Sequence, residues 1–317
     1  MITYLMLIGG FAILIKGADW LVKGSVSVAR RMGISDIVIG LTVVSLGTSS
    51  PELIVNLVAS LNGNSELAMG NILGSNIVNV LFILGVSALI FPLTVKFNTT
   101  YKEIPFALLS GLVILFLGND MLFDGQTKAL LSMGDGLVLL GFFAIFIYYI
   151  IGIARNDVAQ EQTDVQMQLP KAIFFVFIGL AGLIAGGHWV VKSAIVIATG
   201  FGISQSLIGL TVVAIGTSLP ELATSAVAAY KKNTDIAIGN VVGSNIFNIF
   251  WILGISSVIH PIPVLQRSNV DFAMNILAGL LLFVFLFIGK RHMLERWQGG
   301  AFVLCYILYV AYLIQLG

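Results

Sequence analysis

The sequence contains little charge. Only 10% of its 317 residues are charged, whereas 58% are hydrophobic. Ordinary soluble domains carry about 25% charged residues, so a domain folded in water is excluded as the main class and an integral membrane protein is favoured. The formal net charge of +1 also argues against nucleic-acid binding, which normally requires a strongly basic face.

Cysteine and histidine are scarce as well. The single cysteine, Cys305, lies in an apolar segment and cannot form an internal disulfide, so we interpret it as a small packing residue rather than a redox group. The N-terminal apolar segment continues past Lys16, with no basic segment before it and no small-residue cleavage site after it. We therefore expect a retained membrane helix there, not an export signal.

Apolar segments of about 20 residues, the length that crosses a membrane as a helix, recur along the whole chain. We place ten of them, with centres near Leu14, Leu46, Val80, Val113, Phe143, Leu180, Val213, Ile249, Leu281 and Leu308. The longest hydrophilic break, residues 155–170, is too short for a separate domain. We expect no extramembrane regulatory domain.

The two halves of the sequence repeat each other. Residues 40–85 align without a gap with residues 209–254, and more than half of the aligned pairs are identical. The matches include Thr, Ser, Pro, Glu and Asn in the same order, which shared hydrophobicity does not explain. Five spans per half is an odd number, so the second half must enter the membrane with opposite polarity.

These observations predict an all-α integral membrane protein with ten transmembrane helices, built from two inverted-topology five-helix repeats. We assign residues 1–154 to the first repeat, residues 155–170 to a cytoplasmic linker and residues 171–317 to the second repeat. Inverted repeats with interrupted helices are typical of secondary transporters whose site lies near the midplane, at the repeat interface.

Basic residues predict the orientation, because cytoplasmic loops are enriched in Lys and Arg. If the N-terminus is outside, the inner loops contain Lys23, Arg30, Arg31, Lys96, Lys102, Arg155, Lys171, Lys231, Lys232, Lys290, Arg291 and Arg296. The outer side contains only Lys128, Lys192 and Arg267. We therefore expect both termini to be extracellular or periplasmic, in a cell (plasma) membrane.

The first repeated motif reads Gly-Thr-Ser-x-Pro-Glu, at residues 47–52 and 216–221. Thr48 and Glu52 are four residues apart, hence on one helix face. Pro51 lacks an amide proton, so a carbonyl one turn earlier loses its helical partner. One turn of each half thus presents a carboxylate, hydroxyls and a freed carbonyl.

The second motif, Gly-Asn-x-x-Gly-Ser-Asn-x-x-Asn, occupies residues 70–79 and 239–248. No His or Cys belongs to any of the four motif segments, whereas a zinc or copper site would be expected to use them. Hydroxyl, amide and carboxylate oxygens suit Ca²⁺, which takes about 6 to 8 oxygen ligands, and alkali ions. Two glutamates supply a charge of −2, so Ca²⁺ and Na⁺ can compete for the same carboxylates, which is a physical basis for exchange.

Structural roles compete with ion binding at these positions. A buried Glu can pair with Lys or Arg, but neither motif span carries a basic residue in its apolar run. A charged group at mid-membrane costs at least ~2.5–3.5 kcal/mol and is functional by default, so we favour ion binding. Asn71 and Asn240 could be ligands or interhelical hydrogen-bonding groups. Glu66 and Asp235 fit helix-end roles.

Two further residues break the repeat. Asp19 in the first half is matched by His188 in the second. We interpret both as interfacial and assign neither a transport role.

In these paired motifs the chain resembles the calcium/cation antiporter superfamily, and most closely its sodium/calcium exchangers of the prokaryotic type. The resemblance covers essentially the whole chain and implies a secondary antiporter that exchanges Na⁺ for Ca²⁺ by alternating access, electrogenic if three Na⁺ are exchanged per Ca²⁺. It implies no enzyme activity and no cofactor; the partners are the two ions and the lipid bilayer. The cation ligands that it implies are Thr48, Ser49, Glu52, Ser75, Asn79, Thr217, Ser218, Glu221, Ser244 and Asn248.

Two departures refine this resemblance. Potassium-dependent relatives carry an acid at the position of Asn248, so its amide argues against K⁺ co-transport. Proton-coupled relatives carry an acid after the Gly-Asn step, which neither half supplies. An exchanger coupled to H⁺ or selective for another divalent ion, and a cation channel, remain the alternatives.

Overall fold

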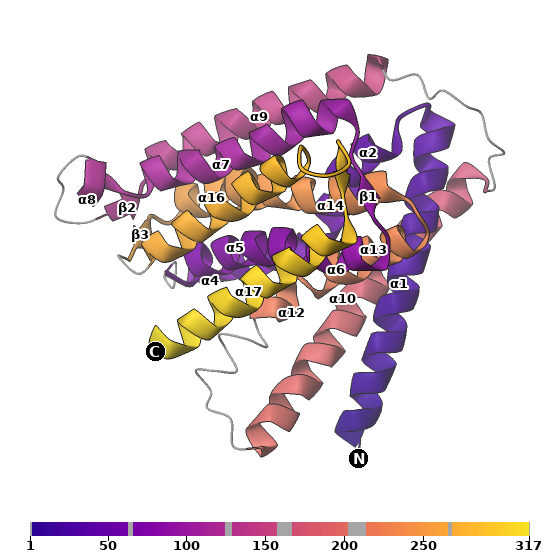
Figure 1. The fold of residues 1–317 in the computed structure, drawn as a ribbon. Coiled ribbons are helices and arrows are strands. Elements are labelled where there is room, and N and C mark those ends of the chain that lie inside the picture. The colour runs from indigo at the N-terminus through magenta and orange to yellow at the C-terminus, as the bar shows by residue number, and fades with distance from the viewer. Residues whose placement is uncertain are drawn as a thin grey trace.

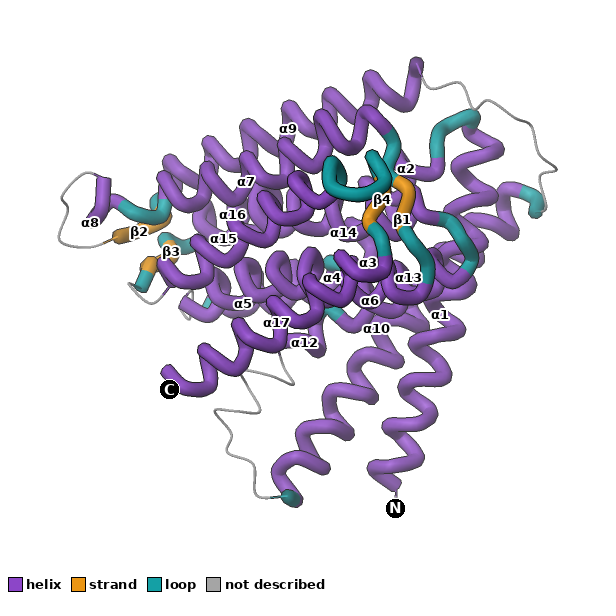
Figure 2. The backbone as a smooth tube through the Cα atoms, in the orientation of Figure 1, coloured by secondary structure: helices purple, strands orange, loops and turns teal. Residues whose placement is uncertain are grey.

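The computed structural model describes residues 2–62, 66–123, 129–156, 167–201, 214–265 and 268–316. Nearly all of these residues are helical (Figures 1 and 2). The first half contains α1 (Ile2–Met32), α2 (Asp36–Ile39), η1 (Gly40–Val44), α3 (Ser45–Thr48), α4 (Ser50–Leu61), α5 (Glu66–Ile77), η2 (Val78–Leu84), α6 (Gly85–Ile90), β1 (Leu93–Thr94), η3 (Thr99–Glu103), α7 (Ile104–Leu117), α8 (Asp120–Phe123), β2 (Ala129–Leu131) and α9 (Met133–Asn156). The η elements are π-helices.

The second half follows the same plan. It contains α10 (Leu169–Gly200), α12 (Ala214–Thr217), α13 (Leu219–Tyr230), α14 (Thr234–Ile246), η5 (Phe247–Leu253), α15 (Gly254–Ile259), β3 (Ile262–Val264), α16 (Ser268–Phe285), β4 (Met293–Leu294) and α17 (Arg296–Leu316).

The described residues include eight helices that are long and apolar enough to cross a membrane, and a ninth span if the bent pair Asp36–Thr48 and Ser50–Leu61 counts as one. The predicted span centred near Val213 falls partly on residues 202–213, which lie outside the described ranges. The predicted all-α membrane fold with two repeats is confirmed.

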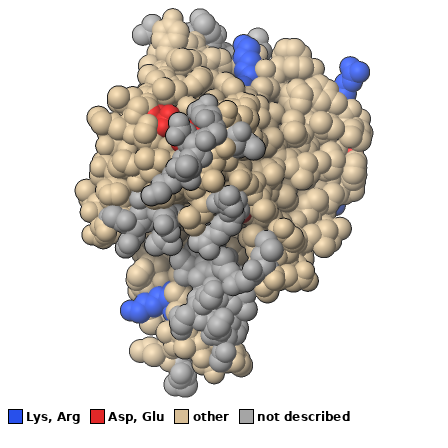
Figure 3. Space-filling view, turned by 90° about the vertical axis from the view of Figure 1, so that its left-hand side faces the viewer, with Lys and Arg blue, Asp and Glu red and all other residues tan. Residues whose placement is uncertain are grey.

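The surface and the centre of the bundle differ in the way that lipid requires. Large apolar side chains point outward, for example Tyr148 with 80% and Phe177 with 68% of its surface exposed. In the motif-bearing segments Ala68–Ile90 and Thr234–Ile259, 78% of the residues in an apolar 18-residue stretch are buried, whereas the share is only 17% in the peripheral segment Met133–Ala154. Charged groups are sparse on the visible surface in Figure 3. The motifs therefore lie in the protected centre, surrounded by helices that face lipid.

Glycine permits a close approach between the two halves. A Cβ atom on Gly239 of α14 would lie 3.0 Å from both the Ile37 carbonyl oxygen and the Leu41 amide nitrogen. The backbones of α14 and of the α2–η1 segment are thus nearly in contact, which only a small residue allows. This contact packs the second motif of the second half against the helical segment that leads into the first motif of the first half.

The helices α1 and α10 form a long pair that leans away from the rest of the bundle (Figure 1). Their backbones also meet at glycine, because a Cβ atom on Gly179 would lie 2.6 Å from the Leu21 amide nitrogen. The first helices of the two repeats therefore pack against each other along most of their length.

Two short antiparallel sheets each join one strand from either half. β1 pairs with β4, with Leu93 opposite Leu294, and β2 pairs with β3, with Ala129 opposite Val264. By their place in the repeat, β1 corresponds to β3 and β2 to β4, so the two sheets are equivalent. They lie at opposite ends of the molecule (Figure 2), as expected for repeats of inverted topology.

Candidate cation-binding site

The first motif interrupts a helix in each half. α3 ends at Thr48 and α4 begins at Ser50, with a bend of 47° between the two segments. Ser49, between them, has φ −80° and ψ 8°. Pro51 stands in the first turn of α4, where a helix does not need the amide proton. In the second half, Ser218 between α12 and α13 has nearly the same backbone angles, φ −87° and ψ 6°.

The two glutamates lie in the first turns of the helices that follow these breaks. Glu52 is 0% and Glu221 is 1% exposed, and each occupies the positive end of a helix dipole, which favours a carboxylate. Their carboxylates are near enough to interact electrostatically. Among the described residues neither forms an ion pair with a basic side chain. The structure therefore brings two unneutralised carboxylates together at the repeat interface.

Each carboxylate is also hydrogen-bonded to the opposite half. The Ser49 hydroxyl donates to Glu221 Oε1 at 2.9 Å, and the Ser218 hydroxyl donates to Glu52 Oε1 at 3.4 Å. The two copies of the first motif are thus joined across the repeat interface, because each half contributes the serine that donates to the glutamate of the other.

Several buried oxygen atoms of the predicted ligand residues have no hydrogen-bond partner in the described part of the chain. They are Glu52 Oε2, Glu221 Oε2, Ser75 Oγ, Asn79 Oδ1 and Asn248 Oδ1. Burying a polar atom without a partner is costly. Carboxylate, hydroxyl and amide oxygens in such a set are the ligands that a hard cation prefers, so the residues present fit Ca²⁺ or Na⁺.

Asn79 and Asn248, from the second motif, lie near the start of η2 and η5. A π-helix inserts one extra residue per turn and occurs frequently at functional sites. Ser75 and Ser244 precede them on α5 and α14. All ten predicted ligand residues therefore belong to the four central motif segments.

Two predicted ligands differ in their side-chain contacts. The Thr48 hydroxyl donates to Asn240 Oδ1 at 3.0 Å. The Thr217 hydroxyl instead interacts with the Glu52 carboxylate. Asn240 in turn donates from Nδ2 to the Glu221 backbone carbonyl at 3.3 Å and to Ser225 Oγ at 3.0 Å. Of its two interpretations, interhelical hydrogen bonding is the one that the contacts support.

The remaining acidic residues singled out in the sequence lie elsewhere. Asp235 stands in the first turn of α14 and forms an ion pair with Lys96 at 2.7 Å. The Glu66 side chain lies outside the described residues. Asn76 and Asn245, which are not among the predicted ligands, are buried and contact each other across the repeat interface.

Comparison with known proteins adds to this geometry. The family described as "Sodium/calcium exchanger protein" matches the chain twice, over residues 2–152 and 171–315. The chain is 32% identical to the sodium/calcium exchanger MaX1 of Methanosarcina acetivorans, over 99% of this chain and 98% of that protein. It is 40% identical to the inner membrane protein YrbG of Escherichia coli, over 87% and 86%. A solved structure of the sodium-calcium exchanger NCX_Mj is similar with a TM-score of 0.84 and 34% identity, covering 98% of this chain and 99% of that one.

Proposed function

Because the chain belongs to the sodium/calcium exchanger protein family, we propose that it exchanges Na⁺ for Ca²⁺ across a cell membrane by alternating access. The observation that supports this proposal most strongly is the buried cluster of unpartnered oxygens around Glu52 and Glu221. Carboxylates held this way, without a basic partner, favour a cation over a structural ion pair.

The proposed ligands are the predicted residues of the four motif segments. They are Thr48, Ser49, Glu52, Ser75, Asn79, Thr217, Ser218, Glu221, Ser244 and Asn248. Two carboxylates neutralise one Ca²⁺, and Na⁺ ions that occupy overlapping positions compete for the same oxygens. Binding of one ion type therefore releases the other.

We further propose that the exchange is electrogenic. If three Na⁺ cross for each Ca²⁺, one net charge moves per cycle, and each 100 mV changes the driving force by about 2.3 kcal/mol. With both termini outside, the basic loops face the cytoplasm, and inward Na⁺ movement expels Ca²⁺.

Flux through proteoliposomes tests this proposal. Vesicles loaded with Na⁺ and diluted into Na⁺-free buffer should take up radioactive Ca²⁺, and uptake should be faster when the vesicle interior is made positive. With no imposed potential, replacing K⁺ by choline should leave the rate unchanged, because Asn248 supplies no third carboxylate. Ca²⁺ uptake driven by a pH gradient without Na⁺ would instead indicate proton coupling. A Ca²⁺ conductance without any counter-ion would indicate a channel.

A further inference from the structure

Two asparagines outside the proposed ligand set join the second motifs of the two halves. Asn76 near the end of α5 is 1% exposed, and Asn245 near the end of α14 is 6% exposed. Asn76 Nδ2 donates to the Asn245 backbone carbonyl at 3.1 Å, and Asn245 Nδ2 donates to the Asn76 backbone carbonyl at 3.3 Å. The two residues therefore bind each other reciprocally.

These bonds determine how both side-chain amides are oriented. A backbone carbonyl can only accept, so the NH₂ group of each side chain must face it. The side-chain oxygens of Asn76 and Asn245 consequently point away from these carbonyls and must receive a donor. That donor comes from the other half: Asn248 Nδ2 lies 2.9 Å from Asn76 Oδ1, and Asn79 Nδ2 lies 3.0 Å from Asn245 Oδ1.

The orientation is thereby passed on to two proposed ligands. Because Asn79 and Asn248 use their NH₂ groups in these bonds, their carbonyl oxygens are left over. Both oxygens are buried and have no hydrogen-bond partner in the described part of the chain. An amide turned the other way would present an NH₂ group, which cannot coordinate a cation.

We propose that Asn76 and Asn245 are positioning residues, forming a cross-repeat amide clasp that turns the oxygens of Asn248 and Asn79 toward the transported cation. The clasp consists of Asn76, Asn79, Asn245 and Asn248, and the inference rests on the proposed function of the site. The pairing is crossed between the halves: Asn76 orients Asn248, and Asn245 orients Asn79. Within its own half, each positioning residue lies three residues before a ligand that it does not orient.

Double-mutant cycles on the KM for Ca²⁺ of Na⁺-driven uptake test this pairing. Ser at position 76 or 245 is too short to replace the amide, so Asn76→Ser and Asn245→Ser should each raise the KM about fivefold. Adding Asn76→Ser to Asn248→Ala should cause no further increase, because the residue to be oriented has already been removed. Adding Asn245→Ser to Asn79→Ala should likewise change nothing further.

The uncrossed pairs are the matched controls. For Asn76→Ser with Asn79→Ala, and for Asn245→Ser with Asn248→Ala, the separate increases in KM should multiply. A purely structural role would give the same coupling in all four combinations. Asn76→Ala and Asn245→Ala provide a second set of variants, and size-exclusion profiles show which proteins are folded.

The outcomes separate the clasp from the proposed function. Suppose that Asn79→Ala and Asn248→Ala raise the KM, but that the separate increases in KM also multiply in the crossed pairs, as in the controls. The clasp is then overturned and the ligand set stands. An unchanged KM in Asn76→Ser and Asn245→Ser also overturns the clasp. An unchanged KM in Asn79→Ala and Asn248→Ala removes both ligands from the proposed site, and the clasp with them.

Discussion

The two motifs are alike in sequence, but the residues around the two glutamates are held differently. The Ser49 hydroxyl lies 2.9 Å from Glu221, whereas the Ser218 hydroxyl lies 3.4 Å from Glu52. Hydroxyl–oxygen hydrogen bonds are normally about 2.7–2.8 Å long and weaken as they lengthen. Glu221 is therefore held more firmly than Glu52, and the site is asymmetric despite its repeated sequence.

This difference predicts unequal effects of removing the two hydroxyls. A hydrogen bond to a charged group contributes about 1.5–3 kcal/mol, and about 1.4 kcal/mol corresponds to a tenfold change in affinity. Ser49→Ala should raise the KM for Ca²⁺ about tenfold, and Ser218→Ala about threefold, in Na⁺-driven uptake by proteoliposomes. A larger effect of Ser218→Ala would contradict the asymmetry.

At the residue scale, the sequence predicted the types of side chain in the candidate site better than the contacts between them. The repeated motifs indicated carboxylate, hydroxyl and amide oxygens, and the family resemblance implied the ten ligands, whose role in ion binding stays a prediction. The bond from Ser49 to Glu221 could not be predicted, because spacing relates residues of one helix and this bond crosses the repeat interface. The crossed asparagine pairs were missed for the same reason.

At the scale of the elements, the sequence predicted the broken helices but not the π-helices. Pro51 indicated a break near Gly47, and the structure places it at Ser49, between α3 and α4. The segments η2 and η5 carry ordinary apolar sequences. A π-helix changes the phase of a helix by one residue without changing its composition, so a short apolar run gives no signal for it.

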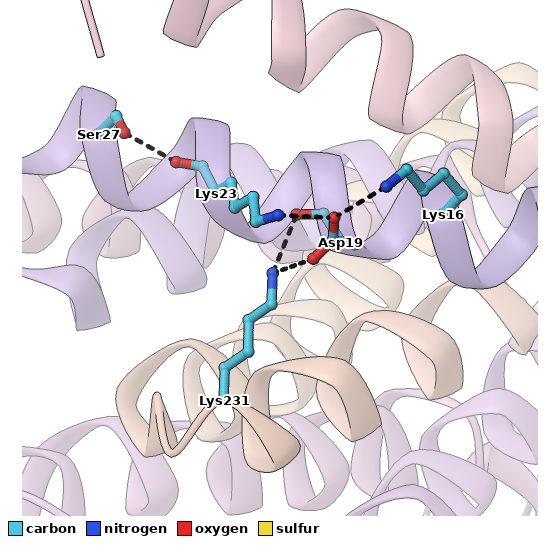
Figure 4. Close-up of polar contacts among 5 residues, drawn as sticks. All are labelled: Lys16, Asp19, Lys23, Ser27 and Lys231. Atoms are coloured by element: carbon cyan, nitrogen blue, oxygen red, sulfur yellow. Dashed lines mark hydrogen bonds and ion pairs between the residues drawn. The ribbon is translucent and has the colours of Figure 1, made fainter. Parts of the chain in front are cut away.

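An ion pair links α1 to the end of α13 and gives Asp19 a role that the repeat did not suggest (Figure 4). Asp19 pairs with Lys231, which follows α13, and with Lys23 at 3.0 Å and Lys16 at 3.7 Å on its own helix. Burial lowers the pKa of the Lys231 ammonium, and the Asp19 carboxylate acts against this shift. Without Asp19, three lysines would crowd together with no counter-charge at this position.

We therefore expect Asp19→Asn to destabilise the fold by about 1–2 kcal/mol, less than the loss of a fully buried pair because water reaches both groups. Thermal unfolding in detergent measures the change. Lys16→Met is the matched control: the Lys16 side chain is 58% exposed and its pair with Asp19 is long, so its effect should stay below about 0.5 kcal/mol. Equal melting temperatures for Asp19→Asn and wild type would contradict this role.

On the scale of the whole molecule, inversion of the repeats explains both the position of the two sheets and the distribution of charge. One surface cleft is lined by four basic residues that we expect on the cytoplasmic side: Arg30, Lys96, Lys231 and Lys232. They come from three different loop or helix-end segments of both halves. Their common location supports the proposed sidedness, with basic loops gathered at one end of the bundle.

Labelling of introduced cysteines tests this sidedness. In a Cys305→Ala background, which removes the single native thiol, Lys96→Cys should react with a membrane-impermeant reagent only from the cytoplasmic side. His260→Cys, at the opposite end, should react only from outside. Both native side chains are exposed. The reverse pattern would invert the orientation and place both termini in the cytoplasm.

Hydrophobic runs and the repeat predicted the membrane class and the inverted architecture from the sequence, because bilayer thickness fixes span length. The close approach at Gly239 was only a possibility in the sequence, since many glycines occur and only tertiary packing decides which of them meet another backbone. The division at residues 154/155 and 170/171 stays a prediction.

The central claim is that Glu52 and Glu221 together bind the transported cation, and Na⁺-driven uptake of radioactive Ca²⁺ by glutamine variants tests it most directly. Glu103→Gln is the matched control, since Glu103 is also buried, at 2% exposure, and accepts a hydrogen bond from Tyr149 away from the motifs. We predict that Glu52→Gln and Glu221→Gln each abolish uptake, because one carboxylate no longer neutralises Ca²⁺, while Glu103→Gln retains it. Uptake that persists at the wild-type rate in either Glu52→Gln or Glu221→Gln would contradict the account.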